Sequence, residues 1–275
     1  MRIFKILNNN AVVVIDGPQE KIVMGKGIAF QKRKNDIIQK QNIEKIFLLH
    51  DNSSEKFQQL LATLPEEHIE LAEKVISYAE GYLNSPLNDH IHIALTDHLS
   101  FALERLEQGF PIQNKLTNEI KLLYKKEYEI GLWAKEEIKK EIGVEIPLDE
   151  VAHIALHIHT AKLGGLSMSE SLERATILRE FIERVEMKLN LTIEESSINY
   201  QRLMTHLRFA LNRIDQGSEF EPMDVDMMEL IKIKYERAFE TSKEIAKYLQ
   251  EEYSVDLPET EIAYISLHLQ RLIQK

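Results

Sequence analysis

The chain has 275 residues, of which 44% are hydrophobic and 29% are charged, a composition typical of a soluble protein with two or three domains. It contains no cysteine, which excludes disulfides and thiolate metal sites. No apolar run approaches the roughly 18 residues of a membrane helix, and the N-terminus lacks the pattern of a signal peptide. We therefore expect a cytoplasmic protein without membrane insertion.

The net charge of −11 is unevenly distributed along the chain. Residues 1–53 carry nine Lys and Arg against five Asp and Glu, whereas the remainder carries 25 against 40. A basic segment can hold an anionic polymer through phosphate contacts, which an acidic segment would repel. The pattern predicts two parts with different partners.

The first 53 residues predict a small all-β domain of four strands. Apolar, β-branched runs alternate there with turn-forming Asn and Gly. The expected strands cover residues 2–7, 11–15, 21–24 and 43–48. Because so small a sheet buries little core by itself, we expect this domain to pair with a second copy as a homodimer.

From about residue 54 the spacing of the apolar residues becomes helical. We expect a linker helix over residues 54–66, followed by two all-α helical bundles over residues 67–169 and 170–275. The glycine pair at positions 164 and 165 marks the break between the bundles.

The two expected bundles are copies of one module. Residues 95–109 recur as residues 203–217 with nine identities, and residues 147–157 recur in part as residues 258–268. Such internal repeats define the architecture of a chain. Each copy contains two histidines at equivalent positions: His98 and His157 in the first, His206 and His268 in the second.

Four equivalent histidines favour a phosphorylation function. Neutral imidazole is a nucleophile near neutral pH, and a phosphoryl group adds nearly two negative charges and three strong acceptors. At a helix-packing surface or a dimer interface, that change can shift the protein between two arrangements. The alternative is that these histidines pack between helices and hydrogen-bond the backbone, because repeats also copy structural residues.

A metal site is a second alternative for the histidine-rich segments. His153 and His157 lie four residues apart on one helix face, as in a zinc half-site. However, no His-Glu-x-x-His run is present, and Tyr264 replaces His153 in the second copy. No Ser-His-Asp arrangement stands out, and the many carboxylates are typical of solvated helix faces. We expect no metal, no cofactor and no enzymatic activity.

The loop after the third strand, residues 25–34, has the composition of a nucleic-acid contact. Glycines let the backbone approach a ligand, Phe30 can stack on a base, Gln31 can bind base edges, and lysines can pair with phosphates. The alternative is an ordinary hairpin loop with a solvated basic run. The Gly-x₄-Gly-Lys pattern of a nucleotide-binding loop is missing.

These motifs resemble the BglG/SacY/LicT family of bacterial transcriptional antiterminators over essentially the whole chain. Residues 5–10 and 24–32 look like the RNA-binding co-antiterminator domain of that family. Residues 87–98 look like its first phosphotransferase-system (PTS) regulation domain, and the second repeat looks like its second.

The resemblance implies that two β domains pair and clamp an RNA hairpin in a nascent leader transcript. That hairpin overlaps a terminator, so binding lets polymerase continue into sugar-uptake genes. The residues implied to contact RNA are Lys5, Asn8, Asn10, Gly25, Lys26, Phe30 and Gln31. Lys26 stands where some family members carry Arg, which would replace a forked contact by a point charge.

The resemblance also implies how the chain is regulated. His98, His157, His206 and His268 match the phosphorylated positions of the family. A sugar-specific enzyme II would phosphorylate the first regulation domain and inactivate the protein, and the carrier HPr would phosphorylate the second and activate it. The resemblance does not identify the inducing sugar, because some motifs of this chain match the glucose-type branch of the family and others match the β-glucoside-type branch.

Two other functions remain as alternatives. One is a DNA-binding activator with the same regulatory domains, against which the strand pattern of the N-terminal part argues, because a helix-turn-helix is missing there. The other is a metalloenzyme that uses the histidine cluster.

Overall fold

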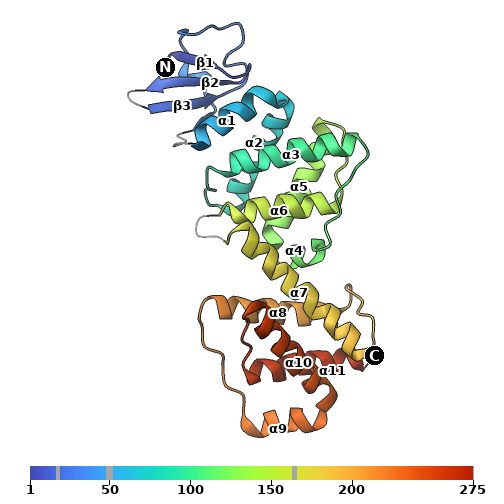
Figure 1. Cartoon of the computed structure of the whole chain (residues 1–275). Helices are drawn as coiled ribbons and strands as arrows, with labels where there is room; N and C mark the ends of the chain where they lie inside the picture. Colours follow the sequence, from blue (N-terminus) through green and yellow to red (C-terminus); the bar gives the residue numbers. More distant parts are fainter. Residues whose placement is uncertain (17–18, 48–51, 163–165, 275) are drawn as a thin grey trace. The chain divides into compact units, whose positions relative to one another are not determined.

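A computed structural model describes residues 1–16, 19–47, 52–162 and 166–274. These residues form two compact units. Unit 1 comprises Met1–Lys115 and Tyr124–Met168, and unit 2 comprises Leu116–Leu123 and Ser169–Lys275 (Figure 1). The glycine pair expected to separate the two bundles lies outside the described residues. Within the described ranges, no helix is long and apolar enough to cross a membrane.

Unit 1 begins with the expected four-stranded sheet. The strands are β1 Ile3–Ile6, β2 Ala11–Asp16, β3 Gln19–Met24 and β4 Lys45–Phe47. They pair antiparallel in the order β1-β2-β3-β4. The third strand begins two residues before its expected start. The fourth is shorter than expected, because Ile43 caps a 3-10 turn, Lys40–Asn42, and Leu48 lies outside the described residues.

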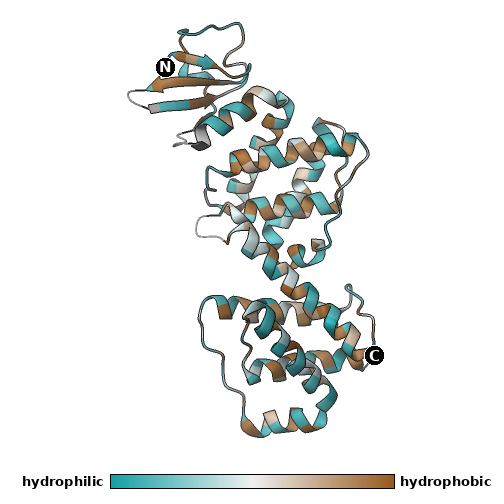
Figure 2. Ribbon diagram, viewed as in Figure 1, coloured by the Kyte–Doolittle hydropathy of each residue, from teal (hydrophilic) through white to brown (hydrophobic). Residues whose placement is uncertain are grey.

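Both faces of the sheet are covered by residues of the same chain. Val12 and Val14 face a core that includes Ile28, Ala29 and Ile38 from the loop between β3 and β4. On the opposite face, the side chains of Ala11, Val13, Ile22, Met24 and Phe47 pack against Phe57, Leu61, Ile69 and Ile93. The alternation along β2 therefore buries successive side chains on opposite faces, and Figure 2 shows this strand as a hydrophobic band.

The helices of unit 1 form a bundle that continues the core of the sheet. They are α1 Asn52–Thr63, α2 Glu66–Leu83, α3 Ile91–Glu107, α5 Lys125–Glu141 and α6 Leu148–Thr160. Helices α2 and α3 pack together, α5 packs against α6, and the pairs α2–α5 and α3–α6 join them. Helix α1 contributes the fully buried Phe57 and Leu61 to the core beneath the sheet.

Unit 2 contains the second repeat and one short segment from the sequence of the first. Its helices are α4 Thr117–Leu123, α7 Met168–Leu189, α8 Ile198–Asp215, α9 Val225–Lys234, α10 Glu236–Tyr253 and α11 Glu259–Ile273. Leu122 and Leu123 of α4 pack against a core that includes Phe181, Leu203 and Leu269. The prediction of a small β domain followed by helical repeats is confirmed, and the segment between α3 and α5 belongs to unit 2.

Candidate functional site

In the first repeat, helices α3 and α6 bring the two equivalent histidines together. The ring centroids of His98 and His157 lie 4.8 Å apart, and His153 lies 5.4 Å from His98. Nε2 of His98 lies 3.2 Å from Oε2 of Glu150. The guanidinium of Arg105 pairs with the other carboxylate oxygen of Glu150 at 3.1 Å. The result is a chain of contacts from histidine to glutamate to arginine.

The second repeat builds the same arrangement from α8 and α11. Nε2 of His206 lies 2.8 Å from Oε2 of Glu261, and the ring of His268 lies 5.2 Å from that of His206. Arg213 approaches Oε1 of Glu261 at 3.9 Å, a looser contact than its counterpart in the first repeat. Tyr264 occupies the place of His153, with its ring 6.0 Å from His206.

The two glutamates are buried, which contradicts the prediction that the carboxylates lie on solvated faces. Glu150 is 1% exposed and Glu261 is 3% exposed. Burial acts to raise the pKa of Glu150, but the contact with His98 and the nearby charges of His153 and Arg105 outweigh it and lower the pKa below its usual value. Glu150 is therefore a carboxylate at neutral pH.

His157 and His268 are neutral imidazoles at neutral pH. Burial, followed by the proximity of His98, lowers the pKa of His157 to about 3. Burial and the proximity of His206, Arg271 and Arg202 lower the pKa of His268 to about 4. Because a neutral ring keeps a free lone pair, both side chains are competent nucleophiles.

Four residues of these sites were not predicted from the sequence: Glu150, Glu261, Arg105 and Arg213. A signal for them was present, because the two glutamates and the two arginines stand at identical positions in the two copies. Residue type alone did not separate them from the many exposed carboxylates and arginines of these helices.

The other histidines of unit 1 are engaged separately. Nδ1 of His92 lies 2.6 Å from Glu73, and Nδ1 of His159 lies 3.2 Å from Glu127. Among the described residues, no three His, Asp or Glu side chains are placed to hold one metal ion. The histidines of unit 1 thus pair with different glutamates at separate places.

The predicted RNA-binding residues of the sheet domain fall into two groups. The first braces the loop after β3. Oδ1 of Asn10 accepts a hydrogen bond from the backbone N–H of Gly27 at 2.6 Å, and Oδ1 of Asn8 accepts one from the N–H of Asn10 at 2.8 Å. Gly25 is required sterically, because a Cβ there would lie 1.9 Å from the carbonyl oxygen of Asn42.

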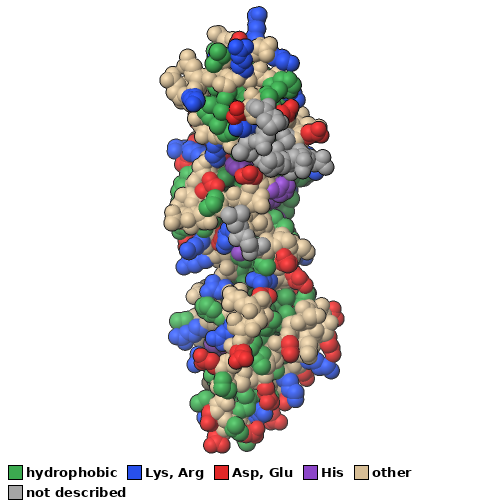
Figure 3. Space-filling model, turned by 90° about the vertical axis from the view of Figure 1, so that its left-hand side faces the viewer, with side chains coloured by type: hydrophobic (Ala, Val, Ile, Leu, Met, Phe, Trp, Pro, Cys, Tyr) green, Lys and Arg blue, Asp and Glu red, His purple; other side chains and the backbone are tan. Residues whose placement is uncertain are grey.

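The second group is open to solvent. Phe30 is 61% exposed although it is a large apolar side chain, and Gln31 beside it is exposed in a left-handed backbone conformation with φ 56°. Lys5 and Lys26 are also exposed. On the face shown in Figure 3, basic side chains are numerous over the sheet domain, and acidic ones are numerous over unit 2.

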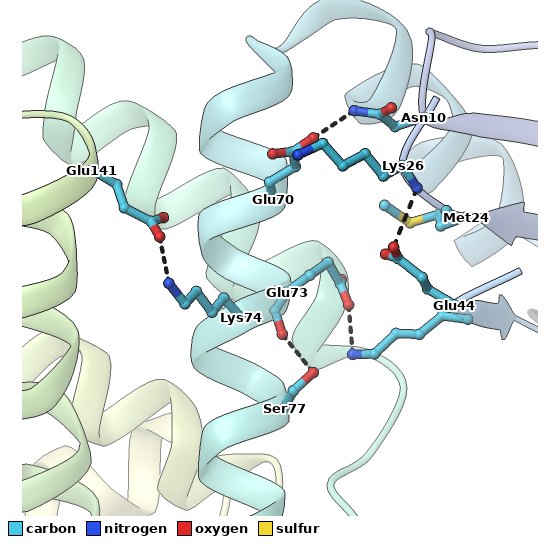
Figure 4. A pocket seen from close by; sticks show the side chains of 11 residues that line it. Asn10, Met24, Lys26, Glu44, Glu70, Glu73, Lys74, Ser77 and Glu141 are labelled. Carbon is cyan, nitrogen blue, oxygen red and sulfur yellow. Dashed lines mark hydrogen bonds and ion pairs between the residues drawn. The ribbon is translucent and has the colours of Figure 1, made fainter. Parts of the chain in front are cut away.

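Helix α2 places carboxylates against the first group. Glu70 accepts a hydrogen bond from Nδ2 of Asn10 at 2.5 Å, and Glu73 pairs with Lys45 at 2.7 Å. These side chains, with Gly25 and Lys26, line a cavity of about 460 Å³. Figure 4 shows the Lys26 side chain extending toward Glu70. One group expected to bind RNA, the amide of Asn10, is therefore bonded to an acidic side chain of the same chain.

Comparison with protein families matches nearly all of this architecture. The model of the CAT RNA-binding domain matches residues 1–56, and the model of the PRD domain matches twice, over residues 73–161 and 179–272. Both histidine–glutamate–arginine sites lie inside the PRD matches.

Several relatives are similar over their full length. The transcription antiterminator LicT of Bacillus subtilis is 38% identical over 100% of both chains. The β-glucoside operon antiterminator of Dickeya chrysanthemi is 35% identical, covering 99% of this chain and 96% of its own. The crystal structure of GlcT CAT-PRDI is 36% identical with a TM-score of 0.55, covering 58% of this chain and 97% of its own.

Proposed function

Because this chain belongs to the family of transcription antiterminators that carry a CAT RNA-binding domain and PRD domains, we propose that it binds an RNA hairpin in a nascent leader transcript. Binding prevents termination ahead of sugar-uptake genes. The observation that carries the proposal is the combination of an exposed aromatic loop on a basic sheet domain with two buried histidine–glutamate sites in the helical repeats.

The RNA contact centres on the loop after β3. Phe30 stacks on an unpaired base, and the amide of Gln31 reaches base edges beside it. Lys5 and Lys26 neutralise phosphates. The remaining proposed residues, Asn8, Asn10 and Gly25, hold the loop in shape through the bonds described above, and Asn10 offers its amide to RNA when Glu70 releases it.

Control comes from phosphorylation of His98, His157, His206 and His268. HPr and a sugar-specific enzyme II of the phosphotransferase system are the proposed donors, with the first repeat inactivating the protein and the second activating it. Each phosphoryl group adds nearly two negative charges to a ring that packs between two helices, so each modification changes the packing between those helices of its repeat.

The protein acts in the cytoplasm as a homodimer. It is a regulator of transcription, as the names of its antiterminator relatives indicate for them. It accepts phosphoryl groups and turns over no substrate of its own. The alternative of a DNA-binding activator finds no support in residues 1–16 and 19–47, where the described elements are strands, turns and one short 3-10 helix.

The test is a titration of the full-length chain with its leader hairpin, followed by fluorescence anisotropy. The full chain is needed because the core of the sheet includes Phe57, Ile69 and Ile93. We expect tight binding whose affinity falls with salt, as phosphate contacts require, and weak binding to duplex DNA of the same length. Equal affinity for both nucleic acids would overturn the proposal.

A further inference from the structure

The two repeats share a feature that bears on the atom that accepts the phosphoryl group. An imidazole ring has two nitrogens, and a neutral ring carries a proton on one and a lone pair on the other. The neighbour of each nitrogen decides which tautomer is present. In His98 and His206, the same nitrogen, Nε2, faces a buried carboxylate.

Nε2 of both rings is closed to a phosphoryl donor. The Nε2 atoms of His98 and His206 are buried from solvent and make no hydrogen bond of good geometry, so what each of them meets is the charge of the nearby carboxylate. Oε2 of Glu150 and of Glu261 lies at 3.2 Å and 2.8 Å from them. An incoming phosphoryl group carries negative charge, so it would meet both a steric barrier and a carboxylate on this side.

The other edge of the ring is accessible in the second repeat. His206 lines an open cavity of about 440 Å³ together with Arg202, Thr205, Phe209 and His268. Because Nε2 of His206 is buried, Nδ1 is the ring nitrogen that can face this cavity. No residue in the described part of the chain forms a hydrogen bond with Nδ1 of His206. The negative charge of Glu261, 2.8 Å from Nε2, favours the tautomer with the proton on Nε2, which leaves the lone pair on Nδ1.

We propose that His98 and His206 accept the phosphoryl group on Nδ1, and that Glu150 and Glu261 are the positioning residues that hold the proton on Nε2. The inference rests on the proposed function, since it concerns the same phosphorylation. The lone pair of Nδ1 attacks the phosphorus of a donor phosphoimidazolium, the donor N–P bond breaks, and its electron pair returns to the donor ring, which leaves as neutral imidazole.

No proton has to move in this step. The acceptor ring ends with the phosphoryl group on Nδ1, the original proton on Nε2 and one positive charge, which the adjacent carboxylate stabilises. Arg105 and Arg213 pair with the second oxygen of each carboxylate and so keep Glu150 and Glu261 in place.

The experiment determines the phosphohistidine isomer at each site. The full-length chain, labelled with ¹⁵N in its histidine rings, is phosphorylated with HPr, enzyme I and phosphoenolpyruvate, and the modified nitrogen is identified by NMR after the sites are assigned with single histidine variants. Phosphoryl groups on Nδ1 of His98 or His206 support the inference. Groups on Nε2 overturn it while leaving the proposed function intact, and no incorporation at either residue overturns both.

Variants of the second repeat test the positioning role of the carboxylate. In Glu261→Ala we expect phosphorylation of His206 to slow by about tenfold and a second isomer to appear, because the tautomer is no longer fixed. Glu261→Asp, which keeps a carboxylate, should retain the Nδ1 product alone. Glu259→Ala, at an exposed acidic residue on the same helix, is the matched control. An unchanged isomer in Glu261→Ala would remove the positioning role.

Discussion

At the scale of the residue, the exposed aromatic ring of Phe30 is the feature that most needs explanation. Burial of a Phe side chain is favourable by roughly 1.5–3 kcal/mol, yet Phe30 is left 61% exposed on the loop of residues 25–34, whose other apolar residues, Ile28 and Ala29, are buried. Such a residue on a basic domain is explained by a partner that covers it. Its ring makes no contribution to the two cores of the sheet.

Replacing this ring should weaken RNA binding without unfolding the protein. For Phe30→Ala we expect a loss of about 1–3 kcal/mol in RNA binding, the range for base–aromatic stacking, measured by anisotropy with the leader hairpin. The matched control is Phe110→Ala, since Phe110 is 68% exposed in the helical part of unit 1. Equal affinities of Phe30→Ala and the unmodified chain would exclude the ring from the interface.

The buried imidazole of His157 makes stability depend on pH. Its pKa in the folded chain is lowered to about 3, first by burial, whereas an unfolded histidine has a pKa near 6.5. The unfolded state therefore binds more protons between these values. The contribution of His157 to stability is complete above about pH 6.5 and declines as the pH falls toward 3.

The corresponding variant is His157→Gln, which removes the titrating group. Between pH 7 and pH 5 the unmodified protein should lose roughly 2 kcal/mol more unfolding free energy than the variant, measured by denaturant unfolding at each pH. A parallel pH dependence in the two proteins would show that folding does not lower the pKa of His157.

At the scale of the element, the turn after β3 depends on one glycine. A Cβ at Gly25 would overlap the carbonyl oxygen of Asn42 at 1.9 Å, so the backbone of the loop must shift. We expect Gly25→Ala to destabilise the chain by roughly 2–4 kcal/mol and to abolish RNA binding, as shown by thermal unfolding and anisotropy. Gly81→Ala is the control, because nothing lies within 4 Å of its Cβ position in helix α2. A similar loss of stability and RNA binding in Gly81→Ala would contradict a specific role of Gly25.

Under the proposed RNA contact, helix α2 competes with RNA for the side chain of Asn10. The bond from Asn10 to Glu70 must break before the amide of Asn10 can contact a nucleotide. Glu70→Gln removes a negative charge next to the proposed RNA site, so we expect RNA affinity to rise by about threefold to tenfold, equivalent to roughly 0.7–1.4 kcal/mol. Glu67→Gln, at an exposed acid on the same helix, should change it less. Lower affinity in Glu70→Gln would contradict this competition.

The elements themselves were largely predictable from local sequence. Alternating β-branched runs gave the four strands, and the helical repeat placed the four histidines on equivalent helices, because both signals are periodic in the chain. The coverage of the sheet by Phe57, Leu61 and Ile69 was not predictable, since it depends on which faces meet in three dimensions. The burial of Glu150 and Glu261 was missed for the same reason: a carboxylate is buried only when its partners arrive from another helix.

At the scale of the whole molecule, the division into units does not follow the order of the chain. Residues Leu116–Leu123, which lie in the sequence between α3 and α5 of the first repeat, belong to unit 2. Glu119 of this segment is buried there, and burial raises its pKa. Arg208 of the second repeat donates a hydrogen bond to the carbonyl oxygen of Leu122 at 3.1 Å. A truncation after the first repeat therefore removes the partners of α4, and functional measurements require the full chain.

The central claim is that this chain suppresses transcription termination by binding leader RNA. The most direct measurement is transcription in vitro from a template that carries the leader and its terminator, with purified full-length protein added. We predict a protein-dependent rise in full-length transcript, absent when the hairpin is mutated and reduced by Phe30→Ala. The account would be contradicted if read-through stayed at its protein-free level over concentrations at which the protein binds the hairpin.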